Sequence, residues 1–404
     1  MEQNALTAIV PIKPEELEAL RKILTEIGND IKNNQLVRFS ETPSTHFARW
    51  VILEDRGLDT DPKFPRLLFT SNYDGTFENY MQELVEKVGS GMEQVWNKCQ
   101  GYSPGTSQDS IRFAEFIKNH SFKSNAFYVG FRGATVKDIL NSMEIRKIID
   151  QILDQVDHKE IKGLKELAKL LPRPPQTLAQ PSASSTKLLP GENVARQPKL
   201  SLFERLLEWL VGVRPGEKNR NKVELNPDLI KQLTKIEDKA VVVQNQMTIV
   251  SPIKPQWLQR LLLRLVLWAA EHQPKSSAGS LLGISTIHFA RWAIIDDGNN
   301  LLFESNYDGS WESYIDDFVD YASVGMNGIW GSAINFPTGG CRDIEGFKQI
   351  IRYYQLPTQV FYSAYPDATV KNILNDLDLS KAIAELLQNK KVERFLTGAY
   401  GSPV

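Results

Sequence analysis

The stretch "TSNYDGTFENY" at residues 70–80 decides the fold, because it returns as "ESNYDGSWESY" at residues 304–314. Matching Asp74 with Asp308 gives an offset of 234 positions, the difference between 74 and 308, and the same offset matches Trp96 with Trp330. Upstream, "STHFARWVI" (44–52) matches "TIHFARWAI" (286–294), with a longer loop in the first copy absorbing the change in spacing. Solenoid repeats are only ~20–50 residues long. The chain therefore contains two copies of a whole domain.

Each copy carries the same order of expected elements. In the first copy the β-rich or helix-periodic segments are strand 7–12, helix 14–28, strands 46–55 and 66–75, helix 76–96, strand 125–133 and helix 135–153. This β-α-β-β-α-β order is that of a ferredoxin-like unit. We therefore expect an α+β protein built from two tandem ferredoxin-like repeats.

The strand "HFARWVIL" (46–53) is apolar on both faces. Successive side chains of a strand point to opposite sides, which separates Ala48 and Trp50 from Phe47 and Val51. Helices cover one face of the sheet in a ferredoxin-like unit, so the other face needs a cover of its own. We expect the sheet of the second repeat to supply it.

The composition sets the domain boundaries and the broad class. We expect repeats at 1–155 and 241–404, separated by an insert at 156–240 that holds a Pro/Ser-rich linker and an amphipathic helix at about 200–212. Two cysteines without zinc-site spacing, a net charge of −2 and no secretory signal indicate a cytoplasmic protein without a structural metal. The chain lacks the basic character of nucleic-acid binders, and no nucleic-acid partner is expected.

The element order and the doubly apolar strands resemble the dimeric α+β barrel superfamily, which includes the dye-decolorizing peroxidases and the chlorite dismutase-like haem proteins. "SNYDG" at 71–75 and at 305–309 is similar to the G-x-x-D-G motif of these peroxidases, with Ser in place of the first Gly. The resemblance implies that the two ferredoxin-like repeats form an intrachain dimeric α+β barrel. It also implies haem as cofactor and the motif aspartate on the distal side of the haem. The second copy offers His272 and His288 as ligand candidates, with Tyr362 as a further cofactor-binding candidate.

Asp74, Asp308, Arg49 and Arg291 are the catalytic candidates. In the structural interpretation, each aspartate caps the helix that follows its strand, and each arginine pairs with an aspartate to pin a hairpin. In the functional interpretation, the aspartate is an acid-base group that moves a proton. His46 lies three residues before Arg49, so strict alternation places the two on opposite strand faces unless a bulge intervenes.

Differences between the repeats are the better place to look for a single site, since shared residues are explained by the shared fold. Tyr365 replaces Phe131 and Glu304 replaces Thr70, whereas Tyr362 matches Tyr128. Glu304, Asn306 and Asp308 alternate along one strand and should share a face.

Two functions follow as expectations. The first is a haem-dependent, peroxidase-like oxidoreductase. The alternative is a non-catalytic binder of an apolar small molecule or lipid, peripheral to a membrane through residues 200–214. The apolar helix in that segment is shorter than the ~20 residues needed to span a bilayer. It therefore has three interpretations: an interfacial helix, a lid, or a helix docked on the body of the protein.

Overall fold

Alternating apolar residues and turn-forming loops build two sheets in the computed structural model, which describes residues 2–54, 65–155, 202–214, 223–237, 243–272, 281 and 283–387. The first repeat contributes strands β1 (Gln3–Pro11), β2 (Thr45–Leu53), β3 (Arg66–Asp74) and β4 (Ala126–Val129). The second contributes β5 (Gln244–Pro252), β6 (Ile287–Ile295), β7 (Asn300–Asp308) and β8 (Val360–Ser363). Both sheets are four-stranded and antiparallel, so the protein is α+β.

Helices follow the strands in the expected order. Those of the first repeat are α1 (Leu17–Asn29), α2 (Phe77–Trp96), α3 (Ser110–Asn119) and α4 (Val136–Gln155). Between the repeats lie α6 (Leu202–Leu210) and α7 (Pro227–Glu237). Those of the second repeat are α8 (Trp257–His272), α9 (Trp311–Tyr321), α10 (Ser323–Trp330), α11 (Ile344–Tyr354) and α12 (Val370–Leu387). Short 3-10 turns are η1 (Pro14–Glu16), η2 (Phe39–Glu41), η3 (Thr106–Gln108), η4 (Asp296–Gly298) and η5 (Gly340–Arg342).

The two repeats exchange their last strands. One sheet has the order β1-β3-β2-β8 and the other β4-β6-β7-β5, so each takes its fourth strand from the other repeat. In the first sheet Trp50 pairs with Val360, and in the second Ala126 pairs with Trp292. A ferredoxin-like order of elements predicts that each repeat pairs its own four strands, and this part of the prediction is wrong. The finding is compatible with a tandem ferredoxin-like arrangement whose halves are joined by hydrogen bonds.

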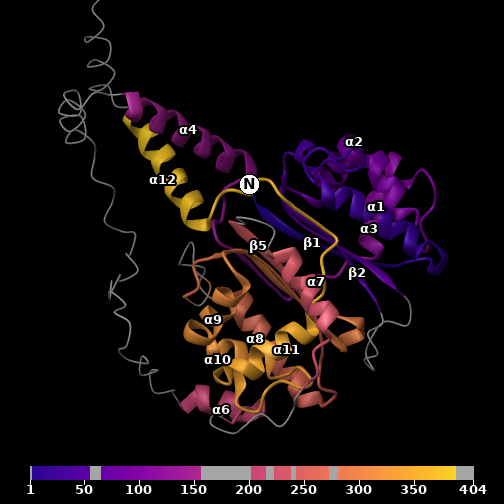
Figure 1. Cartoon of the computed structure of the whole chain (residues 1–404), viewed down its shortest axis with the longest axis vertical. Coiled ribbons are helices and arrows are strands. Elements are labelled where there is room, and N and C mark those ends of the chain that lie inside the picture. Colours follow the sequence, from indigo (N-terminus) through magenta and orange to yellow (C-terminus); the bar gives the residue numbers. More distant parts are fainter. Residues whose placement is uncertain are drawn as a thin grey trace, which may run out of the picture.

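The sheets face each other, as the doubly apolar strands predict. Val51 and Leu68 of one sheet pack with Val250 and Leu302 of the other in one buried cluster. The opposite face of each sheet is covered by helices, α1 to α3 on the first sheet and α8 to α11 on the second (Figure 1). The order of layers is therefore helices, sheet, sheet, helices.

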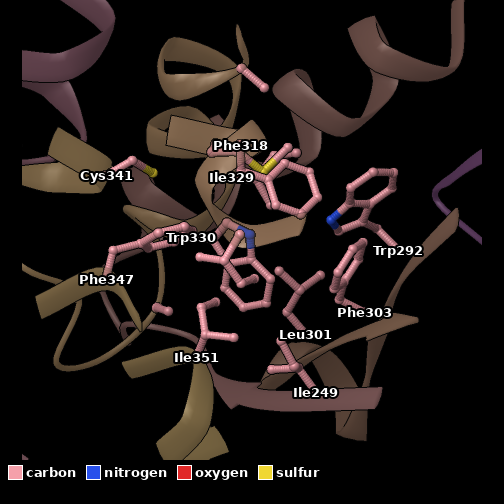
Figure 2. Packing of buried hydrophobic residues seen from close by; sticks show 14 of the residues in the cluster. Ile249, Trp292, Leu301, Phe303, Phe318, Ile329, Trp330, Cys341, Phe347 and Ile351 are labelled. Carbon is pink, nitrogen blue, oxygen red and sulfur yellow. The ribbon is translucent and has the colours of Figure 1, made fainter. Parts of the chain in front are cut away.

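The helix-covered face of the second sheet holds an aromatic core, seen from close by in Figure 2. Trp292 of β6 packs on Phe303 of β7 at 4.9 Å between ring centroids, and Phe303 meets Trp330 of α10 edge to face at 5.7 Å. Figure 2 also shows Cys341 at the border of this cluster, where burial raises the pKa of its thiol. Cys341 is thus a core residue, and Cys99, the other cysteine of the chain, is buried as well.

One long helix of the second repeat is interrupted. The first repeat forms α2 as a single helix, whereas the matching segment divides at Ala322 into α9 and α10. The matching segment of the second repeat is therefore not one continuous helix. Ala322 leaves the helical conformation with φ −122° and ψ 11°, and no side chain caps the new start at Ser323.

The closing helices α4 and α12 lie side by side and extend away from the sheets (Figure 1). Arg146 of α4 donates from Nε to Asp376 of α12 at 2.8 Å. The pairing of the two repeats thus continues beyond the sheets.

Candidate functional site

A β-bulge brings His46 onto the same side of its strand as Arg49. The pairing of β2 with β3 shifts register between Thr45 and Phe47, and β6 shows the same shift at His288. A bulge adds one residue to a strand and redirects the side chain there. The His46 ring therefore lies between the sheets, 5.2 Å from the ring of Phe289. The opposite-face arrangement expected from strict alternation is wrong because the bulge intervenes.

In the first half, three buried side chains form a hydrogen-bonded chain. His46 Nε2 lies 3.0 Å from Asp74 Oδ1, and His46 Nδ1 lies 2.8 Å from the Tyr365 hydroxyl. Burial, reinforced by the charge of Asp74, holds the pKa of Tyr365 well above its usual value. The phenol therefore keeps its proton and donates it to His46 Nδ1, and Asp74 accepts from His46 Nε2. Tyr365 belongs to the second repeat, so the exchange of strands completes this chain.

Asp74 caps a helix, but not the helix that directly follows it in sequence. Its Oδ2 accepts a hydrogen bond from the backbone N of Val136, the first residue of α4, at 2.8 Å. The start of α2 is capped by Thr76, which accepts from Asn79 N. Asp74 therefore caps a helix as expected, but the helix is α4 and not α2, because the chain brings the start of α4 back to the end of β3.

The second half repeats this arrangement with one partner missing. His288 Nε2 lies 2.7 Å from Asp308 Oδ1, and Asp308 Oδ2 accepts from Val370 N at 2.9 Å. The position that matches Tyr365 is Phe131, which offers no hydroxyl. Among the described residues, His288 Nδ1 has no hydrogen-bond partner although the side chain is fully buried. A buried polar atom left without a hydrogen bond costs about 1–3 kcal/mol.

Each arginine reaches across to the opposite sheet. Arg49 donates to Met247 O at 3.0 Å and to Thr248 Oγ1 at 2.9 Å, and it also contacts the Asn306 side chain. Arg291 donates to Ser71 O at 2.9 Å and to Leu6 O. The predicted Arg-Asp pairs are therefore wrong: the arginines join the sheets, and the aspartates bind histidines.

Glu304 lies between the two arginines. Its carboxylate is 3.8 Å from Arg49 Nη1 and 3.6 Å from Arg291 Nε, and all three side chains are nearly fully buried. Burial lowers the pKa of Arg49 and lowers that of Arg291 to about 10, with Glu304 opposing the effect in both cases. Glu304 and Asn306 contact Arg49 and Asn72 of the opposite sheet. Asp308 binds His288, whose ring also faces the opposite sheet at Phe47, so the three residues share a face as their spacing predicts.

The remaining candidates lie elsewhere. Tyr362 lies on the helix-covered face of the first sheet, 5.5 Å from the ring of Phe39. His272 is exposed at the end of α8, where its ring stacks on Trp268 at 4.7 Å. The structure therefore brings neither of them together with His288.

These residues do not fit a haem. An axial histidine needs a ring nitrogen that faces room for a macrocycle. His288 Nε2 is hydrogen-bonded to Asp308. The ring centroids of Phe47 and Phe131 lie 5.5 and 5.8 Å from that of the imidazole. Hydrogen bonds from both arginines bridge the gap between the sheets. In addition, no group of three or more His, Cys, Asp or Glu in the described part of the chain is arranged to hold a metal ion.

The most unusual surface lies on α8. Five apolar side chains of this helix are between 38% and 74% exposed: Trp257, Leu258, Leu261, Leu265 and Trp268. We call this set the α8 face. Positions 257, 261, 265 and 268 follow helical spacing and lie on one side of the helix. Exposed apolar residues scattered singly are ordinary, whereas a contiguous set marks an interaction surface.

The matching helix of the first repeat carries no such face. When the buried residues Leu20 and Leu24 of α1 are matched with Leu263 and Leu267 of α8, the exposed Glu18, Lys22 and Thr25 match Leu261, Leu265 and Trp268. The shared fold therefore does not require apolar residues at these positions.

Helix α6 is docked on α10 and on the η5 turn. Its buried Glu208 accepts from Asn327 Nδ2 at 2.9 Å and pairs with Arg342 at 3.0 Å. A Cβ atom on Gly328 of α10 would lie 3.4 Å from both Leu207 of α6 and Val266 of α8, so the two helices flank α10. Leu206 and Trp209 of α6 remain 53% and 68% exposed. The docked-helix interpretation holds, and the helix still presents apolar residues outward.

The α8 face was not predicted from the sequence, although a signal was present. "QWLQRLLLRLVLW" (256–268) has apolar residues on all sides of a helix, whereas "PEELEALRKIL" (14–24) keeps charges on one side. A helix that is apolar all round is expected to be buried, and comparing the repeats would have raised the question of what covers α8.

No protein-family model matches this chain, and neither a curated protein nor a solved structure was found to be similar to it. The function therefore has to be inferred from the geometry of two features. One is the α8 face, and the other is the buried network between the sheets, which consists of His46, Asp74, Tyr365, His288, Asp308, Arg49, Arg291 and Glu304.

Proposed function

We propose that this protein is a non-catalytic, peripheral lipid-binding protein that attaches to a membrane surface through the α8 face and α6. The observation that carries the proposal is the set of five large apolar side chains exposed on α8, where the matching helix α1 exposes charged and polar ones. Tryptophan and leucine beside arginine are the residues that interfacial helices use.

The helix lengths are consistent with attachment by inserted side chains and not by a helix that spans the bilayer. No helix in the described parts of the chain is long and apolar enough to cross a bilayer. Transfer of one Leu or Phe-sized side chain out of water contributes ~1.5–3 kcal/mol. Partial insertion of the α8 face is thus sufficient for reversible binding.

The buried network supports a non-catalytic function, because its side chains already make structural contacts. His46, Arg49, Arg291 and Glu304 are each nearly fully buried, and their polar contacts join strands, helices and sheets. A catalytic group must meet a substrate, and these side chains meet each other. We therefore assign the network to the assembly of the fold.

Vesicle co-sedimentation tests the proposal. The double variant Leu265→Gln, Trp268→Gln should bind phospholipid vesicles at least about tenfold more weakly than the unaltered protein, because two inserting side chains are lost. Ile111→Gln, on α3, is the matched control, since Ile111 is 79% exposed and lies outside the α8 face. The control should bind normally.

Two results would contradict the proposal. One is an unaltered protein that stays in the supernatant with every vesicle tested. The other is equal binding by the double variant and the unaltered protein. Self-association that disappears in the double variant would instead assign the α8 face to a second copy of the chain.

The haem-dependent oxidoreductase stays a prediction drawn from the resemblance to the dimeric α+β barrel superfamily, as does that superfamily assignment. The network geometry does not favour a haem. Its test is the absorption spectrum after reconstitution with haem: a Soret band that is lost in His288→Ala would revive it.

A further inference from the structure

Arg264 lies on α8 beside the apolar residues. It is exposed and follows Arg260 by one helical turn, so the two arginines form a row along one border of the α8 face. Arg260 is held by the body of the protein, donating from Nη2 to Asn299 Oδ1 at 2.9 Å. Arg264 has no ion pair among the residues that the structure describes. From residue 257 to residue 270 the helix contains these two basic residues and no acidic one.

The first repeat shows how such an arginine is ordinarily neutralised. The match of buried leucines that relates α1 to α8 places Arg21 at the position of Arg264. Arg21 Nε lies 3.3 Å from Glu18, and its guanidinium also pairs with Glu54. In the second repeat, Leu261 stands at the position of Glu18. The change that creates the apolar face therefore also removes one of the two carboxylates that pair with Arg21. The other, Glu54, matches Asp296, which pairs with Arg66 in this structure.

We propose that Arg264, supported by Arg260, binds the phosphate of anionic phospholipids while the α8 face inserts beside it; this inference rests on the proposed membrane attachment. The guanidinium presents a planar fork of donors that matches phosphate oxygens. Its long apolar stem allows the charge to reach the headgroups while the helix lies at the level of the acyl boundary. Trp257 and Trp268 are suited to the same interfacial depth.

Charge complementarity favours anionic over zwitterionic lipid. A basic residue near an anionic leaflet strengthens binding about fivefold, an effect that weakens with added salt. Arg260 is already engaged with Asn299, so Arg264 should carry the larger share of the preference. The headgroup contact therefore selects the membrane, and the apolar face supplies attachment to any fluid lipid surface.

Binding of the full chain to two kinds of vesicle tests the inference. Vesicles of phosphatidylcholine alone are compared with vesicles that also contain phosphatidylglycerol. The unaltered protein should bind the phosphatidylglycerol vesicles more tightly, and Arg264→Gln should lose about fivefold in affinity for these vesicles only. Arg21→Gln is the matched control, because this arginine is paired in the other repeat, and it should retain the preference.

The outcomes separate the two proposals. Binding to both kinds of vesicle without preference, or a preference retained in Arg264→Gln, overturns the role of Arg264 and leaves membrane attachment standing. Binding to neither kind overturns membrane attachment itself. Loss of binding to phosphatidylcholine vesicles by Arg264→Gln would also contradict the inference, because it would show damage to the apolar face.

Discussion

At the residue scale, the unequal histidines are the clearest difference between the halves. The ring centroids of Tyr365 and His46 lie 5.9 Å apart at 75°, and those of Phe131 and His288 lie 5.8 Å apart at 79°. Because the geometry is the same, Phe131→Tyr should place a hydroxyl against His288 Nδ1. We expect it to raise the free energy of unfolding by about 1 kcal/mol, measured by urea denaturation.

The reverse change is its control. Tyr365→Phe should lower stability by about 1–3 kcal/mol, because it leaves His46 Nδ1 buried without its donor. Equal stability of both variants and the unaltered protein would show that these histidines do not need a donor at Nδ1.

At the element scale, helices and strands followed from local pattern where burial was regular. The β2 strand reads as apolar on both faces, and both faces are covered, one by helices and one by the second sheet. Prediction failed where one residue changes the geometry. The bulge at His46 leaves no mark in the apolar pattern, because it depends on how β2 pairs with β3.

Helices α1 and α8 show the same limit. Both were expected as helices at matching places, and both form. What surrounds them differs, since α8 exposes tryptophan and leucine to solvent. Helix formation depends on local sequence, whereas exposure depends on which other elements pack against the helix.

At the scale of the whole molecule, Glu304 balances the charge between the sheets. Glu304→Gln should lower the free energy of unfolding by about 3 kcal/mol in thermal or urea denaturation, because it leaves two buried guanidinium groups without a carboxylate. The first repeat has Thr70 at the matching position and cannot compensate.

A second substitution provides the control. Thr70→Glu in the Glu304→Gln background places a carboxylate at the pseudo-symmetric position facing the same arginines, and should recover part of the lost stability. If Glu304→Gln unfolds like the unaltered protein, the backbone carbonyl contacts of Arg49 and Arg291 are enough by themselves to hold the sheets together.

The sequence by itself determined the duplication, the order of the elements, the doubly buried strands and the shared face of Glu304, Asn306 and Asp308, because each of these depends on residue type and spacing along the chain. Only the tertiary structure decided that β4 and β8 change places, that each aspartate binds a histidine and that each arginine reaches the opposite sheet. It also decided that α8 stays uncovered within the described residues. The physical reason is that backbone pairing and burial are settled between segments far apart in sequence, and the same strand can pair with either repeat without any change in its own pattern.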